Sequence, residues 1–241
     1  MRILYIILFI CTSYQIQAQL NVPSLSPNAS LKQTVGLTEI EINYSRPSIR
    51  KRTIFGEKGL LPYGTFWRVG ANTATKISFS NEVNIMGNNM DSGAYTILAK
   101  PSSDIWKLYW YPYTSGNWST YVEKEPLFIT EIPVEKTPTM VETMEIHFNA
   151  ITFDAVTLII EWEHTKLNIP IKVPTKQYAI KSIDNIMSGP STNDYFRAAL
   201  YLHESNTDLS KALTYIKKVT SSENALFFQV TREALYDTPN A

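Results

Sequence analysis

The stretch LTEIEINYS, residues 37–45, alternates apolar and polar side chains and decides the fold. Ile40, Ile42 and Tyr44 fall on one face, and the residues between them are polar. A two-residue period with one polar face is typical of a half-buried β-strand. Similar runs recur over residues 26–174, separated by turn-forming residues and without a helical period. This two-residue alternation predicts a mainly β fold, with an antiparallel β-sandwich over residues 26–174.

Several turns are expected within this region, and Asp91-Ser92-Gly93 is one of them. Gly87-Asn88-Asn89 has the residue types of a tight turn between short strands. The run VTLIIEWEHTKLNIPIKVP, residues 156–174, is interpreted as a hairpin that reverses direction near residues 163–166.

The apolar period changes to a helical one after Pro174. Four helices are expected over residues 175–241. The first ends at Gly189-Pro190, the second covers about residues 193–204, the third is capped by Thr207-Asp208, and the fourth follows Ser221-Ser222. In the fourth helix, the residues expected to face inward include Phe228, Val230 and Leu235. Residues 201–219 resemble one tetratricopeptide helix pair, and one copy does not make an array.

The N-terminus has the three-part layout of a secretory signal. Arg2 is followed by an unbroken apolar run over residues 3–11 and a polar stretch that ends near Ala18. The apolar run is about half the roughly 20 residues that a membrane-spanning helix needs. Residues 1–18 are therefore predicted to be a signal peptide, and no membrane span is expected after its cleavage.

Charge and cysteine content exclude several function classes. Basic and acidic residues number 22 each, so the net charge does not favour binding to nucleic acid or to an anionic membrane. Cys11 is the only cysteine and falls within the predicted signal, so neither a disulfide nor a thiolate site is expected. Export without disulfides favours the periplasm or cell exterior of a gram-negative bacterium.

Four segments together resemble a known family. They are YSRPSIRKRTIFG (44–56), LPYGTFWRVGANTAT (61–75), SGAYTILAKP (92–101) and EWEHTKLNIPI (161–171). Their order and spacing are similar to those of domain-of-unknown-function family 2911, exported proteins of Bacteroidetes-type bacteria. The resemblance implies an exported β-rich domain followed by helices, and it implies no activity. Lys51 stands where this family is expected to have a glycine.

The first candidate site comes from these family segments. If the segments converge, they bring together guanidinium groups, an aromatic ring and an amide, from Tyr44, Arg46, Arg52, Trp67, Arg68 and Asn72. Arginine forks match the geometry of carboxylate, phosphate or sulfate, and tryptophan offers a stacking face for a ring. The structural alternative is that each arginine ties loop carbonyls and nearby acids into a fixed turn.

The second candidate site is the aromatic run WKLYWYPYTSGNWSTY, residues 106–121. In a strand, Trp106, Leu108 and Trp110 share one face, and Tyr111 lies on the other. One face is expected in the core. The other, with Trp118, is either a platform for sugar rings or a surface covered by a second layer. Trp110, Tyr111 and Trp118 are therefore kept as secondary ligand contacts.

Two glutamates and three histidines are the candidates for a catalytic or a metal-binding site. Glu161 and Glu163 are two apart on a strand, a spacing compatible with glycoside hydrolysis and equally with a solvated face. His147, His164 and His203 do not follow the His-x-His or His-x-x-x-His spacing of metal sites, so neither a metal nor a cofactor is predicted.

The sequence therefore favours an exported, non-catalytic binding module for a small anionic or sugar-like ligand. Two alternatives stay open. One is a glycan-active hydrolase that uses Glu161 or Glu163, and the other is a module that docks a partner protein through the C-terminal helices.

Overall fold

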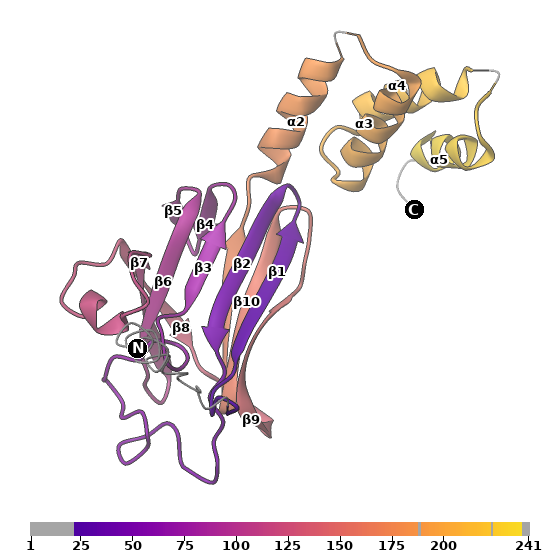
Figure 1. Ribbon diagram of the computed structural model, residues 1–241. Helices are drawn as coiled ribbons and strands as arrows, with labels where there is room; N and C mark the ends of the chain where they lie inside the picture. The colour runs from indigo at the N-terminus through magenta and orange to yellow at the C-terminus, as the bar shows by residue number, and fades with distance from the viewer. Residues whose placement is uncertain (1–21, 188, 223, 238–241) are drawn as a thin grey trace, which may run out of the picture.

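The structure is a computed structural model that describes residues 22–187, 189–222 and 224–237, so the predicted signal peptide lies outside the described residues. In this part of the chain, two antiparallel sheets pack face to face and four helices follow at one end (Figure 1). The predicted mainly β fold with C-terminal helices is confirmed.

The larger sheet has the order β1-β2-β3-β6-β7-β8. Its strands are β1 (Asn28–Val35), β2 (Thr38–Ser45), β3 (Lys76–Phe79), β6 (Gly93–Lys100), β7 (Ile105–Pro112) and β8 (Phe128–Pro133). The smaller sheet has the order β5-β4-β10-β9, with β5 (Asn88–Met90), β4 (Val83–Ile85), β10 (Ala155–Lys172) and β9 (Glu135–Asn149). A 3-10 helix, η1 (Trp118–Tyr121), lies between β7 and β8.

The inner faces of the two sheets form one apolar core. Ile40 and Ile42 of β2 are buried as their alternation predicts, and so are Trp106 and Trp110 of β7. Ile160 and other inward residues of the smaller sheet belong to the same cluster. Burial of alternate residues from both sheets in one cluster is the packing of a β-sandwich.

The turn between β4 and β5 lies earlier than the sequence predicts. Met86 and Gly87 have φ angles of 52° and 92°, and Asn84 accepts a hydrogen bond from the Gly87 amide. Positive φ at two successive residues is the requirement of a tight type I′ hairpin turn. Asn88 and Asn89 are therefore strand residues and not turn residues.

The hairpin predicted near residues 163–166 is wrong, because β10 continues through this segment. Its pairing with β9 shifts register on both sides of Glu163, whose φ is 57°. The buried positions consequently change from even numbers, as at Trp162, to odd numbers, as at Thr165. A bulge inverts the alternation without reversing the chain, and the sequence pattern does not separate the two.

The C-terminal helices are α2 (Thr175–Ile186), α3 (Thr192–Glu204), α4 (Leu209–Thr220) and α5 (Phe227–Asp237). Ser191 and Asp194 form a reciprocal capping box at the start of α3, and the Asp208 side chain caps α4. None of the helices in the described residues is long and apolar enough to cross a membrane. The tetratricopeptide-like character of this segment stays a prediction.

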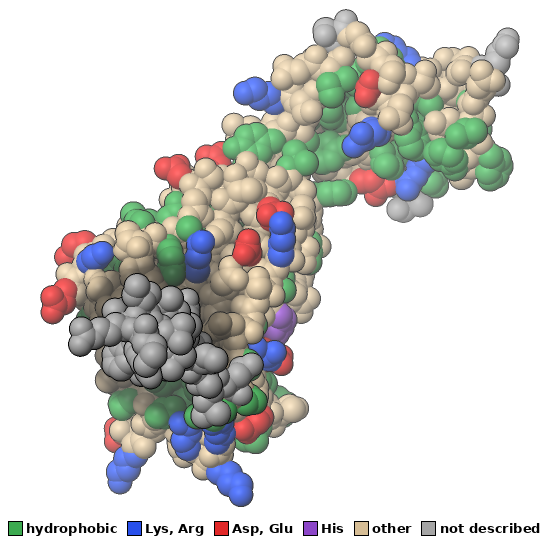
Figure 2. Space-filling view, viewed as in Figure 1, with side chains coloured by type: hydrophobic (Ala, Val, Ile, Leu, Met, Phe, Trp, Pro, Cys, Tyr) green, Lys and Arg blue, Asp and Glu red, His purple; other side chains and the backbone are tan. Residues whose placement is uncertain are grey.

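The inward face predicted for the fourth helix is wrong. α5 has no buried residue, and Phe228, Val230 and Leu235 are each about half exposed. Figure 2 shows hydrophobic side chains on the surface of this helical part. The apolar stripe is covered only in part: the Phe228 ring contacts Phe196 of α3, with centroids 5.5 Å apart, and about half of the Phe228 side chain stays exposed.

The helices meet the sandwich at a close contact beside the β1–β2 turn. Gly36 has a φ of 55°, and a Cβ atom added there would collide with the Thr175 hydroxyl and the Phe153 carbonyl oxygen. The Phe153 ring also contacts Tyr201 of α3, with ring centroids 5.9 Å apart. The loop over residues 46–75 lies at the opposite end of the sandwich (Figure 1).

Candidate functional site

A hollow of about 430 Å³ opens beside the loop over residues 46–75. Its wall is built from this loop, from the chain just before β1, from η1 and from β10. Five of the nine candidate residues line it, namely Arg52, Trp67, Arg68, Asn72 and Trp118. The structure thus brings together residues from separate parts of the sequence, as the candidate site requires.

The segment that carries Arg68 is held rigidly on both sides. The Trp67 amide and carbonyl each bond to Ala99 of β6 at 2.8 Å, and the Trp67 indole donates to the Gly70 carbonyl at 2.9 Å. The Thr75 hydroxyl donates to the Val69 carbonyl at 2.6 Å. These bonds hold the backbone at Trp67, Val69 and Gly70 without any contribution from the Arg68 guanidinium.

The same segment contains a strained backbone. Val69 is fully buried with a φ of 52°, a conformation that a β-branched residue rarely adopts. Strain of this kind costs on the order of 1–3 kcal/mol, and it persists only where the surroundings over-determine the conformation. Here the bonds of Trp67 and Thr75 supply that constraint, next to Arg68.

Arg68 is the cation in this hollow that lacks a partner. Among the described residues, its guanidinium takes part in no ion pair, and its buried Nε has no hydrogen-bond acceptor. The guanidinium carbon lies 5.2 Å from the centre of the Trp118 ring, within cation–π distance. Burial lowers the pKa of Arg68. An unsatisfied buried donor is destabilising. The two Nη groups have no acceptor among the described residues either, and they are not buried, so they are the donors that an external anion can reach.

Arg52 adds a second positive charge, and it is partly committed to the loop. Its Nε donates to the Ile49 carbonyl at 2.9 Å and its Nη2 donates to the Ser48 carbonyl at 2.7 Å. A guanidinium has five N–H donors, so three remain. No acidic side chain lines the hollow among the described residues. The electrostatics of this hollow therefore favour an anion.

Trp67 and Asn72 mainly shape the hollow. Trp67 is 5% exposed and stacks on Trp162, with centroids 5.8 Å apart, so most of its indole belongs to the core. The Asn72 amide donates to the Ser26 carbonyl at 3.1 Å and to the Ser45 hydroxyl at 3.2 Å. Asn72 thereby ties the chain before β1 to the loop, and it has a φ of 58°.

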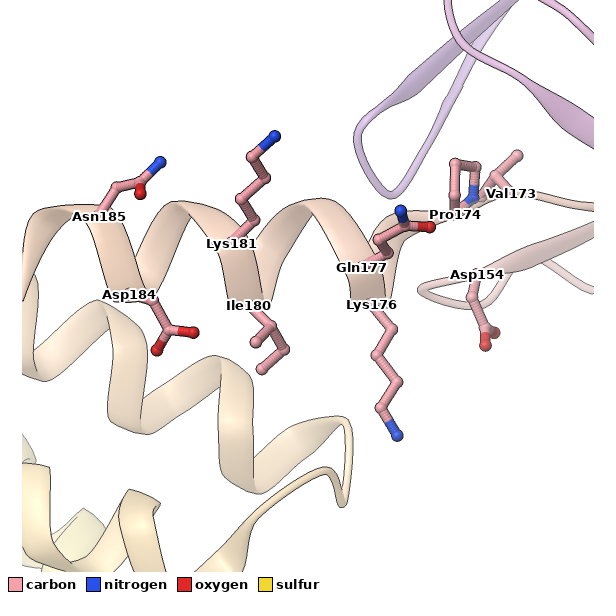
Figure 3. A pocket seen from close by; sticks show the side chains of 9 residues that line it. All are labelled: Asp154, Val173, Pro174, Lys176, Gln177, Ile180, Lys181, Asp184 and Asn185. Atoms are coloured by element: carbon pink, nitrogen blue, oxygen red, sulfur yellow. The ribbon is translucent and has the colours of Figure 1, made fainter.

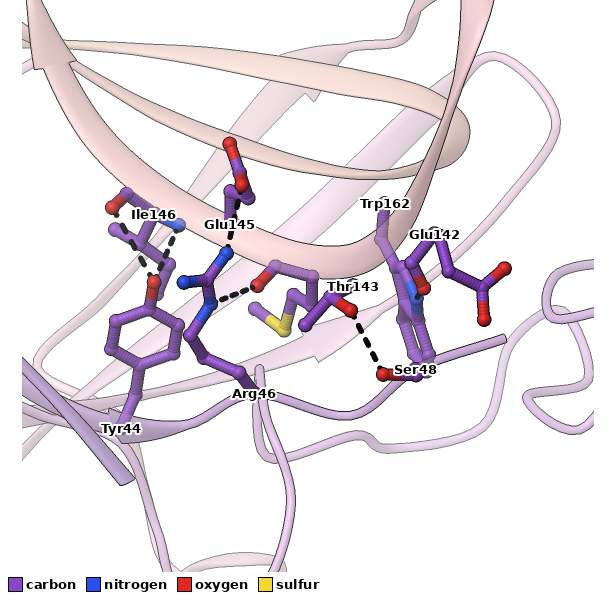
Figure 4. Close-up of polar contacts among 9 residues, drawn as sticks. Tyr44, Arg46, Ser48, Glu142, Thr143, Glu145, Ile146 and Trp162 are labelled. Carbon is purple, nitrogen blue, oxygen red and sulfur yellow. Dashed lines mark hydrogen bonds and ion pairs between the residues drawn. The ribbon is translucent and has the colours of Figure 1, made fainter. Parts of the chain in front are cut away.

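Tyr44 and Arg46 do not line this hollow; they join the two sheets (Figure 4). The Tyr44 hydroxyl accepts from the Ile146 amide at 2.9 Å. Arg46 donates from Nε to the Met144 carbonyl at 2.9 Å and from Nη2 to the Glu145 carboxylate at 2.8 Å. For Arg46 the structural alternative considered from the sequence is the one that the geometry supports.

Trp110 and Tyr111 are buried in the structure and reach no open surface. Trp110 is 0% exposed and its indole donates to Thr130, and Tyr111 is 2% exposed. Tyr111 packs against Tyr121 of η1, which covers the outer face of β7. The aromatic platform is thus closed by a second layer at this point. Of Trp110, Tyr111 and Trp118, the half-buried Trp118 is the one that lines the hollow at Arg68.

Glu161 and Glu163 have different surroundings. Glu163 accepts hydrogen bonds from the backbone amides of Ile54 and Phe55 at 3.1 and 3.5 Å, so it anchors the loop. Glu161 is paired with Glu145 in the ladder between β10 and β9. The bulge at Glu163 puts the two carboxylates in different surroundings. The Glu163 carboxylate is already hydrogen-bonded to the loop.

A larger hollow of about 700 Å³ runs along α2. Figure 3 shows that its side chains point in different directions, with Lys176 and Asp184 on one side of the helix and Lys181 on the other. Asp184 is also paired with Lys211, at 3.1 Å. This hollow is an open groove without convergent polar groups, so the hollow at Arg68 is the better candidate site.

Comparison with known proteins gives one finding. No curated protein and no solved structure matches the chain. A family model described as "Protein of unknown function (DUF2911)" matches residues 26–171, which cover the two sheets except Lys172 and the lining of the hollow except Leu25. The chain therefore belongs to the DUF2911 family, as the four sequence segments indicate.

Proposed function

We propose that this protein is an exported, non-catalytic binding module and that the hollow at Arg68 binds a small anionic ligand. The observation that carries the proposal is the Arg68 guanidinium, which is stacked on Trp118 and has neither an acidic partner nor an acceptor for Nε among the described residues. A carboxylate, sulfate or phosphate group would accept the bidentate hydrogen bonds that this guanidinium can donate.

The rest of the wall suggests what the anionic group is attached to. Trp118 and Phe66 line the same hollow with partly exposed rings, together with leucines. Aromatic faces bind flat apolar groups and the apolar faces of sugar rings. The ligand class that fits is therefore an anion that carries a ring, either an aromatic acid or an acidic sugar.

The N-terminal sequence supports the cellular location. Its basic start, apolar run and Ala18 fit a secretory signal. We place the protein in the periplasm or at the cell exterior of a gram-negative bacterium, where such a ligand would be a nutrient, a metabolite or a piece of surface glycan.

The test is calorimetric titration with phenyl phosphate, glucuronate and inorganic phosphate, with phenol and glucose as uncharged ring controls. We expect the ring-bearing anions to bind more tightly than phosphate and the neutral rings not to bind. Arg68→Met should abolish the binding. Arg197→Met, on an exposed arginine of α3, is the matched control and should bind as the parent does.

Two outcomes would reject the proposal. One is the absence of binding by every anion in the panel. The other is equal affinity in the parent and in Arg68→Met, which would place the ligand elsewhere.

A second proposal rests on α5, which presents Phe227 with 87% of its surface exposed, next to the half-exposed Phe228 and Val230. Exposed apolar patches of this kind mark protein interaction sites. Docking of a partner protein through the helices would cover them. A Phe227→Ser and Phe228→Ser double variant that keeps its binding partners in cell extracts would count against this second role.

A further inference from the structure

A second cluster of polar side chains lies on the outer face of the smaller sheet, away from the hollow at Arg68. Glu145 and His147 are two apart on β9, so their side chains share one face. Glu161 of β10 is paired with Glu145 across the ladder. One ligand atom from each of Glu145, His147 and Glu161 can be chosen so that all three lie within 4.8 Å of one another.

This arrangement is electrostatically unfavourable by itself. Two carboxylates at directly opposed positions of a β-ladder repel each other. Arg46 donates to one oxygen of Glu145, Oε1, at 2.8 Å. Among the described residues, neither Glu161 nor His147 has a hydrogen bond or ion pair through its side chain, so a cation from solution would neutralise a charge that the chain leaves unpaired.

Arg46 also orients one of these carboxylates. Its Nε is fixed on the Met144 carbonyl, and its Nη2 holds Oε1 of Glu145, as Figure 4 shows. This leaves Oε2 of Glu145 available. Carboxylates that bind metals are commonly held by a hydrogen bond to the other oxygen, which fixes their direction.

From this geometry we propose that Glu145, His147 and Glu161 bind a divalent transition-metal cation of the Zn²⁺ class. An imidazole with two carboxylates suits Zn²⁺ and its first-row neighbours, whereas Mg²⁺ and Ca²⁺ prefer oxygen ligands alone. Ligand bonds to Zn²⁺ are about 2.0–2.2 Å long, so ligand atoms lie about 3.3–3.6 Å apart in a tetrahedral site. The three side chains must close in by small rotations, and three ligands leave one position for water.

The site is independent of the proposed anion-binding function. Its ligands come from two strands through the ladder register, which explains why the spacing of the histidines along the sequence does not predict it. Arg68→Met should therefore leave metal binding unchanged.

The experiment is calorimetric titration of the full chain with ZnCl₂, followed by His147→Asn and Glu161→Gln. We expect one site in the parent and a loss of about ten-fold or more in affinity in each variant. His164→Asn is the matched control, because His164 is exposed and lies outside the cluster. Zn²⁺ should also raise the urea midpoint of the parent and not that of Glu161→Gln.

The proposal is overturned if the parent does not bind Zn²⁺, or if both variants bind it as the parent does. Equal binding of Mg²⁺ by the parent and by His147→Asn, with no preference for Zn²⁺, would also overturn it by removing the imidazole from the site. Tryptophan fluorescence of each variant checks that the sandwich is folded, because all five tryptophans lie within residues 67–162.

Discussion

Replacing Arg68 with methionine should make the protein more stable while it abolishes anion binding. The buried Nε of Arg68 has no acceptor among the described residues, and an unsatisfied buried donor costs about 1–3 kcal/mol. Methionine keeps most of the apolar stem and removes the donor. The loss is the cation–π contact with Trp118, worth about 0.5–1 kcal/mol. The expected net gain in the free energy of unfolding is about 1 kcal/mol.

Urea denaturation followed by tryptophan fluorescence measures this change in a buffer without polyvalent anions. The urea midpoint should rise at an unchanged slope, and the melting temperature should rise by about 2–4 °C. The matched control is Arg46→Met, which breaks the bonds to the Met144 carbonyl and to Glu145 and should destabilise the protein by roughly 1–3 kcal/mol. If Arg68→Met is destabilised as much as Arg46→Met, then Arg68 is a structural residue and the reasoning fails.

Three further predictions concern stability. Tyr44→Phe leaves the Ile146 amide without its acceptor and should cost about 1–3 kcal/mol in urea denaturation, and an unchanged midpoint would contradict that bond. Lys51 has a φ of 61°, so Lys51→Gly should relieve strain and stabilise the protein by up to about 1 kcal/mol, whereas a lower midpoint would show that unfolded-state entropy dominates. Hydrogen bonds from Ser191 lower the pKa of Asp194, so the stability that this carboxylate gives to α3 is present above its ordinary unfolded pKa and is lost as the pH falls through the lowered value. Far-UV circular dichroism in acid should show this loss in the parent and not in Asp194→Asn, and identical acid profiles would disprove it.

Most of the fold could be predicted because alternation is a local property. Ile40 and Ile42 are buried because their neighbours in sequence are polar, and the strands around them follow. The bulge at Glu163 and a turn give the same sequence pattern, because the alternation is interrupted at this point in both cases. The exposed face of α5 was not predictable, since an apolar stripe does not show whether a neighbour covers it.

The candidate site could be predicted only in part. The sequence groups Arg46, Arg52 and Arg68 in family segments, but their hydrogen-bond acceptors decide which of them is free. The acceptor of Arg46 is the Met144 carbonyl, which is 98 positions away in the sequence. A local sequence pattern does not reveal a hydrogen-bond acceptor so far away along the chain. An arginine that has an acceptor and one that lacks it therefore cannot be told apart from the sequence.

The glycine at the β1–β2 turn has a consequence for how signals could pass through the molecule. Gly36 lets the sandwich and the base of α2 approach closely, at the end opposite the loop that carries Arg68. Under the two proposals above, a ligand in the hollow and a partner on the helices would bind at opposite ends of the sandwich. Any coupling between them would have to pass through the contact around Gly36 and Thr175, where the helices meet the sandwich.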